Sequence, residues 1–126
     1  MKKIRMLVAD DNKEICEGLK KFLERKGYEV KTANNGSDAV AVVKADKPHA
    51  ILLDIRMPGM DGIEALEKIL EIDKGAGVIM ITGLEKDELV GKCMRMGACG
   101  YIKKPLDLAV LESNLTTLLH TMTERE

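Results

Sequence analysis

Short, uninterrupted apolar segments alternate along this chain with segments that have the periodicity of an amphipathic helix. Five segments have the length and composition of strands: residues 4–9, 28–32, 50–53, 78–81 and 99–102. The second segment alternates between apolar and polar residues, as a more exposed strand does. Residues 50–53 are apolar at every position, which is typical of a strand buried on both faces of a parallel sheet. The alternation therefore favours folds with a parallel sheet enclosed by helices.

A helical pattern follows each predicted strand. The apolar stripes of these helices lie within residues 15–23, 39–43, 63–70, 89–94 and 108–122. Gly27 is placed to end the first helix, and Ser37 is a suitable cap for the second. Asp61 and Glu64 form a variant of the capping box at the start of the third. Five strands and five helices in alternation predict an α/β domain of (βα)5 type.

The chain of 126 residues is long enough for one domain, and two would each be cramped. We expect a single domain over residues 1–126, with its core between about residues 3 and 122, and a break at Gly75 and Gly77 before the fourth strand. The 20 basic and 21 acidic residues give a net charge of -1, which lacks the basic footprint of a nucleic-acid-binding protein. No apolar run approaches the roughly 20 residues that a membrane span needs.

The cysteines and the start of the chain indicate a cytoplasmic protein. Cys16, Cys93 and Cys99 are odd in number and form no Cys-x-x-Cys pair, so neither a disulfide framework nor a zinc site is expected. Reduced cysteines are the ordinary state in the cytoplasm. The apolar run that follows Met1 ends at Asp10, too early for a signal peptide.

Polar residues stand where the predicted strands end. Asp10 and Asp11 follow the first strand, Asp54 the third and Thr82 the fourth, and the fifth strand leads to Lys104. Open parallel sheets bind ligands at the carboxyl ends of their strands. Three carboxylates, a hydroxyl and an ammonium group are therefore expected to meet at one edge of the sheet.

Three crowded carboxylates raise one another's pKa values, and a divalent cation relieves their repulsion. Carboxylate oxygens suit Mg²⁺, whereas zinc prefers His and Cys ligands, which are absent here. The alternative is that Asp10, Asp11 and Asn12 only cap the first helix, although one such residue would suffice. We expect a magnesium site.

Asp54 has the setting of a nucleophile. A carboxylate can attack a phosphoryl group and form an aspartyl phosphate. The metal ion and Lys104 would neutralise charge on the transferring group, and Thr82 would donate a hydrogen bond to one of its oxygens.

Four segments together carry a resemblance to a known family. They are Asp10-Asp11, Thr82-Gly83, the sequence LDIRMPGMDG over residues 53–62 and the sequence GYIKKP over residues 100–105. In this order and spacing, over essentially its whole length, the chain resembles the receiver domains of bacterial response regulators. The resemblance implies a flavodoxin-like, doubly wound fold with a five-stranded parallel sheet in the order 2-1-3-4-5.

The resemblance also implies a role for each residue of the site. Asp54 is expected to accept phosphate from a phosphohistidine on a sensor histidine kinase or a phosphotransfer protein. Asp11 is expected to be the main Mg²⁺ ligand, together with Asp54 and the backbone carbonyl of Arg56, and Asp10 to act through a bound water. Mn²⁺ is expected to substitute for Mg²⁺. Lys104 is the expected phosphate-binding lysine.

Thr82 and Tyr101 resemble the switch pair of the family. The phosphoryl group is expected to draw the Thr82 hydroxyl inward, and Tyr101 to fill the vacated space. The Lys104-Pro105 bond is expected to be cis, as in the family. The surface of the fourth helix, fifth strand and fifth helix is the expected output face, used by a downstream protein target, a covalent effector domain in a longer chain or a second copy in a homodimer.

Two positions are expected to tune the lifetime of the phosphorylated state. Leu84 is apolar, where family members with fast self-hydrolysis often carry a residue able to orient water. Arg56 is long enough to shield the phosphoryl group. We therefore expect slow autodephosphorylation, and an unchanged lifetime in a Leu84→Glu variant would count against that hypothesis.

Three other functions compete with a phosphorylated switch. A phosphatase of the haloacid dehalogenase type would carry its nucleophile on the first strand with a second Asp two residues later, whereas Asp10 and Asp11 are adjacent. A flavin-binding flavodoxin would need a phosphate loop there, and two carboxylates would repel a phosphate. A receiver that only binds proteins, without phosphorylation, stays open. We therefore expect a regulatory domain rather than an enzyme. Such a domain catalyses only its own phosphorylation and slow dephosphorylation.

Overall fold

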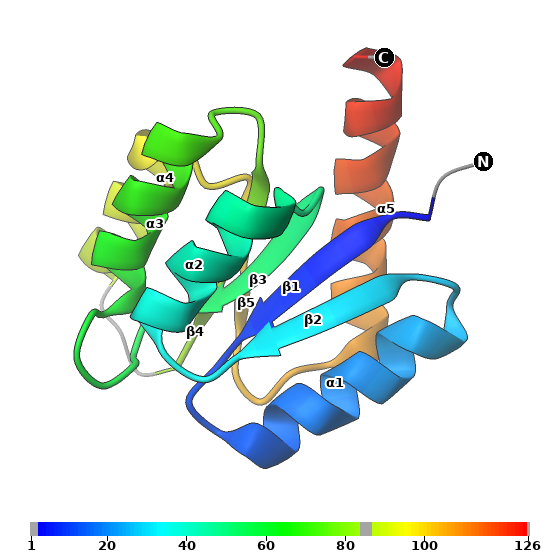
Figure 1. Ribbon diagram of the computed structural model, residues 1–126, viewed down its shortest axis with the longest axis horizontal. Helices are drawn as coiled ribbons and strands as arrows, with labels where there is room; N and C mark the ends of the chain where they lie inside the picture. Colours follow the sequence, from blue (N-terminus) through cyan, green and yellow to red (C-terminus); the bar gives the residue numbers. More distant parts are fainter. Residues whose placement is uncertain (1–2, 84–86, 126) are drawn as a thin grey trace.

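The computed structural model describes residues 3–83 and 87–125, and within them the predicted (βα)5 order is confirmed (Figure 1). The strands are β1 (Arg5–Ala9), β2 (Glu29–Ala33), β3 (Ala50–Asp54), β4 (Gly77–Thr82) and β5 (Gly100–Lys103). The helices are α1 (Lys13–Arg25), α2 (Gly36–Asp46), α3 (Gly62–Ile72), α4 (Asp87–Met96) and α5 (Leu108–Arg125). All paired strands are parallel, in the order β2-β1-β3-β4-β5 that the family resemblance implied.

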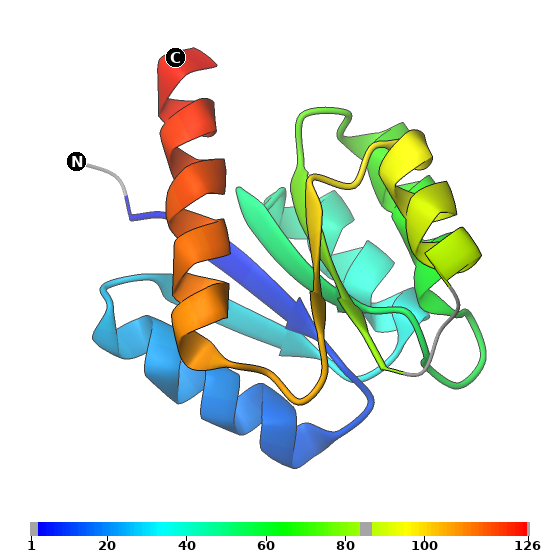
Figure 2. The same cartoon turned by 180° about the vertical axis from the view of Figure 1, so that it is seen from behind.

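The sheet separates two apolar cores. Helices α2, α3 and α4 cover one face, and α1 and α5 cover the other (Figures 1 and 2). Because side chains alternate along a strand, neighbouring residues of β3 enter different cores: Ile51 and Leu53 pack with the first group of helices, and Leu52 with the second. Among the described residues, no helix is both long enough and apolar enough to cross a lipid bilayer.

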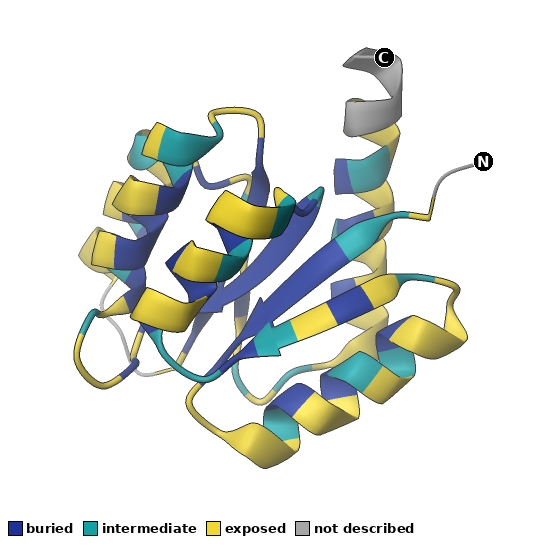
Figure 3. Ribbon diagram, viewed as in Figure 1, coloured by how far each residue is buried: buried dark blue, intermediate teal, exposed yellow. Residues whose placement is uncertain are grey.

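Burial follows the position of each strand in the sheet (Figure 3). Every residue of the central strands β3 and β4 is buried, as their unbroken apolar sequences predict. The edge strands β2 and β5 alternate between buried and exposed residues. The sequence of each strand therefore reflects whether it lies at the centre or the edge of the sheet.

Two predictions about loop residues were wrong. The α2 helix is capped by Asn35, whose side chain accepts a hydrogen bond from the Asp38 N–H at 2.8 Å, and Ser37 lies inside the helix. Gly77 does not precede β4 but begins it. A Cβ atom at Gly77 would lie 2.8 Å from the side chain of Leu118, so the glycine makes room for α5 against the sheet.

Candidate functional site

The carboxyl ends of the strands bring the predicted residues together. Asp10 directly follows β1, Asp54 ends β3, Thr82 ends β4, and Lys104 follows β5. Among the described residues, Asp10, Asp54 and Thr82 are the only buried polar or charged ones. Burying carboxylates costs free energy unless partners compensate for the lost water, so this cluster indicates a functional site.

Lys104 supplies the cation of the cluster. Its Nζ lies 2.9 Å from Oδ2 of Asp54, to which it donates a hydrogen bond, and 3.4 Å from Oδ2 of Asp10. Partial burial on its own lowers the pKa of the Lys104 ammonium, but the hydrogen bond and charge of Asp54, followed by those of Asp10, raise it above the ordinary value. Lys103, by contrast, is exposed on the edge strand. Of the two lysines, Lys104 is therefore the one that contacts the acidic cluster, and the Lys104-Pro105 bond is cis as expected.

The second carboxylate oxygens of Asp10 and Asp54 accept hydrogen bonds from backbone N–H groups. Oδ1 of Asp10 accepts a hydrogen bond from the Asn12 N–H at 2.9 Å, and Oδ1 of Asp54 accepts one from the Arg56 N–H at 3.1 Å. The cap of α1 is Asn12, whose side chain accepts from the N–H groups of Glu14 and Ile15. Helix capping therefore does not account for the two preceding carboxylates.

The acidic cluster fits a divalent cation. Carboxylate oxygens of Asp10, Asp11 and Asp54 all lie within 4.8 Å of one another, with Asp11 exposed and the other two buried. An all-oxygen donor set with an open, solvent-facing side suits Mg²⁺ or Mn²⁺, which keep bound waters, and does not suit zinc. The residues present therefore match the cation that the sequence predicts.

Burial dominates the electrostatics of Asp10. Desolvation raises the pKa of its carboxyl above the ordinary value of 3.8, the charge of Asp54 raises it further, and the Asn12 hydrogen bond and Lys104 oppose the rise. Without a cation, two buried carboxylates share one ammonium group. The charged form of Asp10 is therefore a source of instability in the metal-free protein.

Asp10→Asn is expected to stabilise the metal-free protein at neutral pH by about 1 kcal/mol. Because the folded protein binds the Asp10 proton more tightly than the unfolded chain does, the wild type gains stability as pH falls through the raised pKa toward 3.8. The advantage of the variant should therefore shrink in mild acid. Urea unfolding in EDTA at neutral and mildly acidic pH measures both effects, and a variant that is less stable at neutral pH would contradict them.

The predicted switch residues lie on neighbouring strands. The Thr82 hydroxyl is buried and has no hydrogen-bond partner among the described residues. An unpaired buried hydroxyl is costly, so its oxygen is suited to a ligand that enters the cluster. Tyr101 on β5 is 46% exposed, and α4 and α5 also carry exposed apolar side chains: Leu89, Met94, Leu108 and Val110. Leu84, the predicted tuning position, lies outside the described residues.

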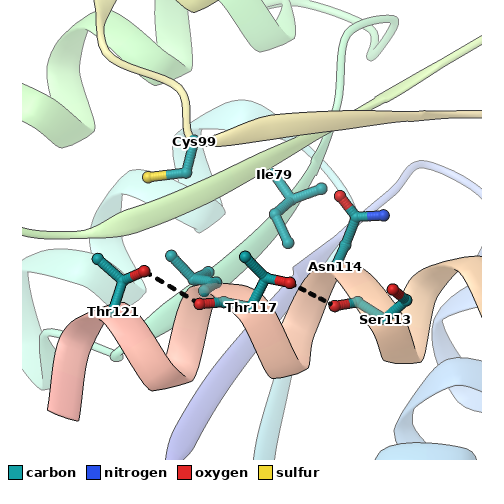
Figure 4. Close-up of a pocket in the computed structure, with 7 residues that line it drawn as sticks. Ile79, Cys99, Ser113, Asn114, Thr117 and Thr121 are labelled. Carbon is teal, nitrogen blue, oxygen red and sulfur yellow. Dashed lines mark hydrogen bonds between the residues drawn. The ribbon is translucent and has the colours of Figure 1, made fainter. Parts of the chain in front are cut away.

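A hollow outside the acidic cluster lies beside α5, which lines it together with Ile79 of β4 and with Cys99 (Figure 4). It opens near Cys99, at the amino end of β5, away from the carboxyl ends where the acidic cluster lies. The hydroxyls of Thr117 and Thr121 donate to the carbonyl oxygens of Ser113 and Thr117 one turn earlier in the helix. Its lining residues carry no charged side chain: Ile79, Cys99, Ser113, Asn114, Thr117, Leu118 and Thr121. This hollow therefore offers no counterpart to the chemistry of the acidic cluster.

Two residues near the cluster were not identified from the sequence. The side chains of Asn34, interpreted only as part of a turn, and of Cys16 both contact the backbone carbonyl of Asp10. The separations of 24 and 6 residues along the chain follow no local motif. The adjacent residues Asn34 and Asn35 indicated only a turn, so no sequence signal pointed to this contact.

Comparisons with known proteins agree with this geometry. A family model described as the response regulator receiver domain matches residues 6–116. The chain is 45% identical over 118 residues to the chemotaxis protein CheY of Treponema pallidum. That alignment covers 91% of this chain and 82% of the relative. It superposes with a TM-score of 0.90 and 32% identity on a CheY-like receiver domain protein from Methanospirillum hungatei, covering 98% and 99% of the two chains. A complex of CheX, CheY, BeF3 and Mg from Borrelia burgdorferi matches with a TM-score of 0.87 and 36% identity, covering 92% of this chain and 89% of that one.

Proposed function

The chain belongs to the family of response regulator receiver domains, and from that membership we propose that it is a signalling switch activated by phosphorylation of Asp54. One observation on this chain itself supports Asp54 as the phosphoacceptor. The Asp54 carboxylate is buried at the end of a central strand, yet it has an ammonium group at 2.9 Å and two further carboxylates within 4.8 Å. A purely structural aspartate would not need both.

In the proposed reaction, a carboxylate oxygen of Asp54 attacks the phosphorus atom of a phosphohistidine on a kinase or phosphotransfer protein. The new P–O bond forms as the P–N bond breaks, and the imidazole leaves with the electron pair of that bond. Lys104 neutralises part of the charge on the phosphoryl oxygens from its position beside Asp54. A Mg²⁺ ion held by Asp11, Asp54 and the Arg56 carbonyl, and by Asp10 through water, would supply further charge neutralisation. The related complex from Borrelia burgdorferi contains Mg together with BeF3, which supports the choice of this cation.

The proposed output follows from the buried hydroxyl of Thr82. A phosphoryl group on Asp54 would offer that hydroxyl an acceptor, and Tyr101 would move inward on the neighbouring strand. The readout surface would then be the face formed by α4, β5 and α5, which includes the exposed Tyr101 on β5. A downstream protein, a covalent effector domain or a second copy would bind there, in the cytoplasm.

Intact-mass measurement after incubation with acetyl phosphate tests this function. With Mg²⁺ present, the protein should gain one phosphoryl group, and EDTA should abolish the gain. An adduct that forms equally well in EDTA would contradict the role of the metal. The absence of any adduct would favour a protein-binding receiver without phosphorylation, and continuous release of phosphate at a high rate would favour a phosphatase with an aspartyl nucleophile.

A further inference from the structure

Two side chains outside the acidic cluster donate hydrogen bonds to the backbone carbonyl oxygen of Asp10. Nδ2 of Asn34 lies 3.1 Å from this oxygen, and Sγ of Cys16 lies 3.3 Å from it. The same two donor atoms are 3.5 Å apart. Asn34 belongs to the loop between β2 and α2, whereas Cys16 belongs to α1. The carbonyl is therefore held by two elements that are distant from each other in the sequence.

Two further polar groups of Asp10, its N–H and its Oδ1, are also hydrogen-bonded. Its N–H donates to the carbonyl oxygen of Ala33 at 3.0 Å, and its Oδ1 accepts from the Asn12 N–H. A peptide group is planar, so fixing the Asp10 carbonyl also fixes the direction in which the chain continues to Asp11. Asp11 is exposed, so its position depends on its backbone more than on packing around its side chain. The donors on the Asp10 carbonyl thus hold the backbone from which the Asp11 carboxylate extends.

We propose that Asn34 is a positioning residue, assisted by Cys16, which fixes the Asp10–Asp11 peptide so that the Asp11 carboxylate faces the divalent cation. The consequence for metal binding rests on the proposed function. The neighbouring Asn35 cannot share the role, because its side chain caps α2 and pairs with Asp38. The loop therefore carries two asparagines with separate tasks, one for the helix and one for the site.

The test compares Asn34→Ala with the matched control Asn35→Ala by calorimetric titration with Mg²⁺. Residues that orient metal ligands typically cost tenfold or more in affinity when removed, so Asn34→Ala should bind Mg²⁺ about tenfold more weakly. Asn35→Ala should lower the melting temperature through loss of the helix cap but leave the Mg²⁺ affinity unchanged. Equal affinities in the two variants would overturn the proposal, even if Asn34→Ala were the less stable protein.

Cys16 offers a conservative rescue. Cys16→Ser keeps a donor of similar shape and should retain the wild-type affinity for Mg²⁺, whereas Cys16→Ala loses the donor and should bind more weakly. If both variants bound Mg²⁺ as the wild type does, Cys16 would have no part in positioning.

A measurement on the metal-free protein separates this inference from the proposed function. Backbone amide exchange and ¹⁵N relaxation at Asp11 and Asn12 report how firmly the peptide is held. Asn34→Ala should speed exchange and increase motion at these two amides, and Asn35→Ala should not. If the wild type bound no Mg²⁺, the metal requirement of the proposed function would fail, and the amide data would still decide the positioning role. Unchanged amides in Asn34→Ala would overturn that role.

Discussion

Asp54→Asn should abolish the acetyl phosphate adduct completely, even in the presence of Mg²⁺. The amide oxygen of asparagine is a poor nucleophile and carries no negative charge, so it cannot form the acyl phosphate bond. Asparagine has the same shape as aspartate, and its single oxygen can still accept one of the two hydrogen bonds that Asp54 receives on separate oxygens, from the Arg56 N–H and from the Lys104 ammonium. The variant should therefore fold and fail only in the chemistry.

The matched control for this variant is Asp61→Asn. Asp61 lies in the loop that follows Asp54, is exposed, and caps α3 by accepting from the Glu64 N–H at 2.9 Å. Asparagine caps a helix about as well as aspartate, so Asp61→Asn should be phosphorylated like the wild type. An adduct that survived in Asp54→Asn would place the acceptor on another side chain, which peptide mapping would then identify.

Lys104→Ala should destabilise the metal-free protein by about 2 kcal/mol at neutral pH. It removes the ammonium group that contacts the buried carboxylates of both Asp10 and Asp54. The expected loss lies below that of a fully buried pair, since the lysine side chain is 31% exposed and part of its interaction is screened. Saturating Mg²⁺ should recover most of the loss, because the cation then neutralises the same carboxylates.

The pH dependence of that loss has a defined sign. The pKa of Lys104 is raised in the folded protein, so its contribution to stability is complete below the ordinary value of 10.5 and disappears as pH rises through the folded value. In acid, protonation of Asp10 removes the repulsion that the lysine relieves. Urea unfolding of the wild type, Lys104→Ala and the exposed control Lys103→Ala in EDTA measures the effect. A loss as large in Lys103→Ala would rule out the pairing as its cause.

Much of the fold and the placement of the site residues could be predicted because the relevant signals are local. An unbroken apolar run such as residues 50–53 requires burial on both faces, and a polar residue at its end marks the edge of the sheet. Once the strands are parallel, their ends must meet, so Asp54 and Thr82 are placed by topology alone. The convergence of these residues was thus predictable without any side-chain contact.

The predictions that were wrong or missing depend on contacts between distant parts of the chain. Asn35 and Ser37 are equally good caps, and the choice between them depends on where α2 begins against the sheet. Position 77 of β4 holds a glycine because Leu118, far along the chain, occupies the space that a Cβ atom would need there. Asn34 reaches the Asp10 carbonyl only when β2 lies beside β1. Local sequence patterns carry no trace of such pairings.

The two buried carboxylates that share one ammonium group set thermodynamic stability against the chemistry of the site. Substitutions that remove negative charge at Asp10 are expected to make the metal-free protein more robust while harming its chemistry. Selection for signalling must therefore act continuously against mutational drift toward a more stable, inert domain. In a lineage released from that selection, the carboxylates at the strand ends should be replaced long before the apolar residues of β3 and β4. Replacing a buried apolar residue brings no gain in stability, so those residues should persist.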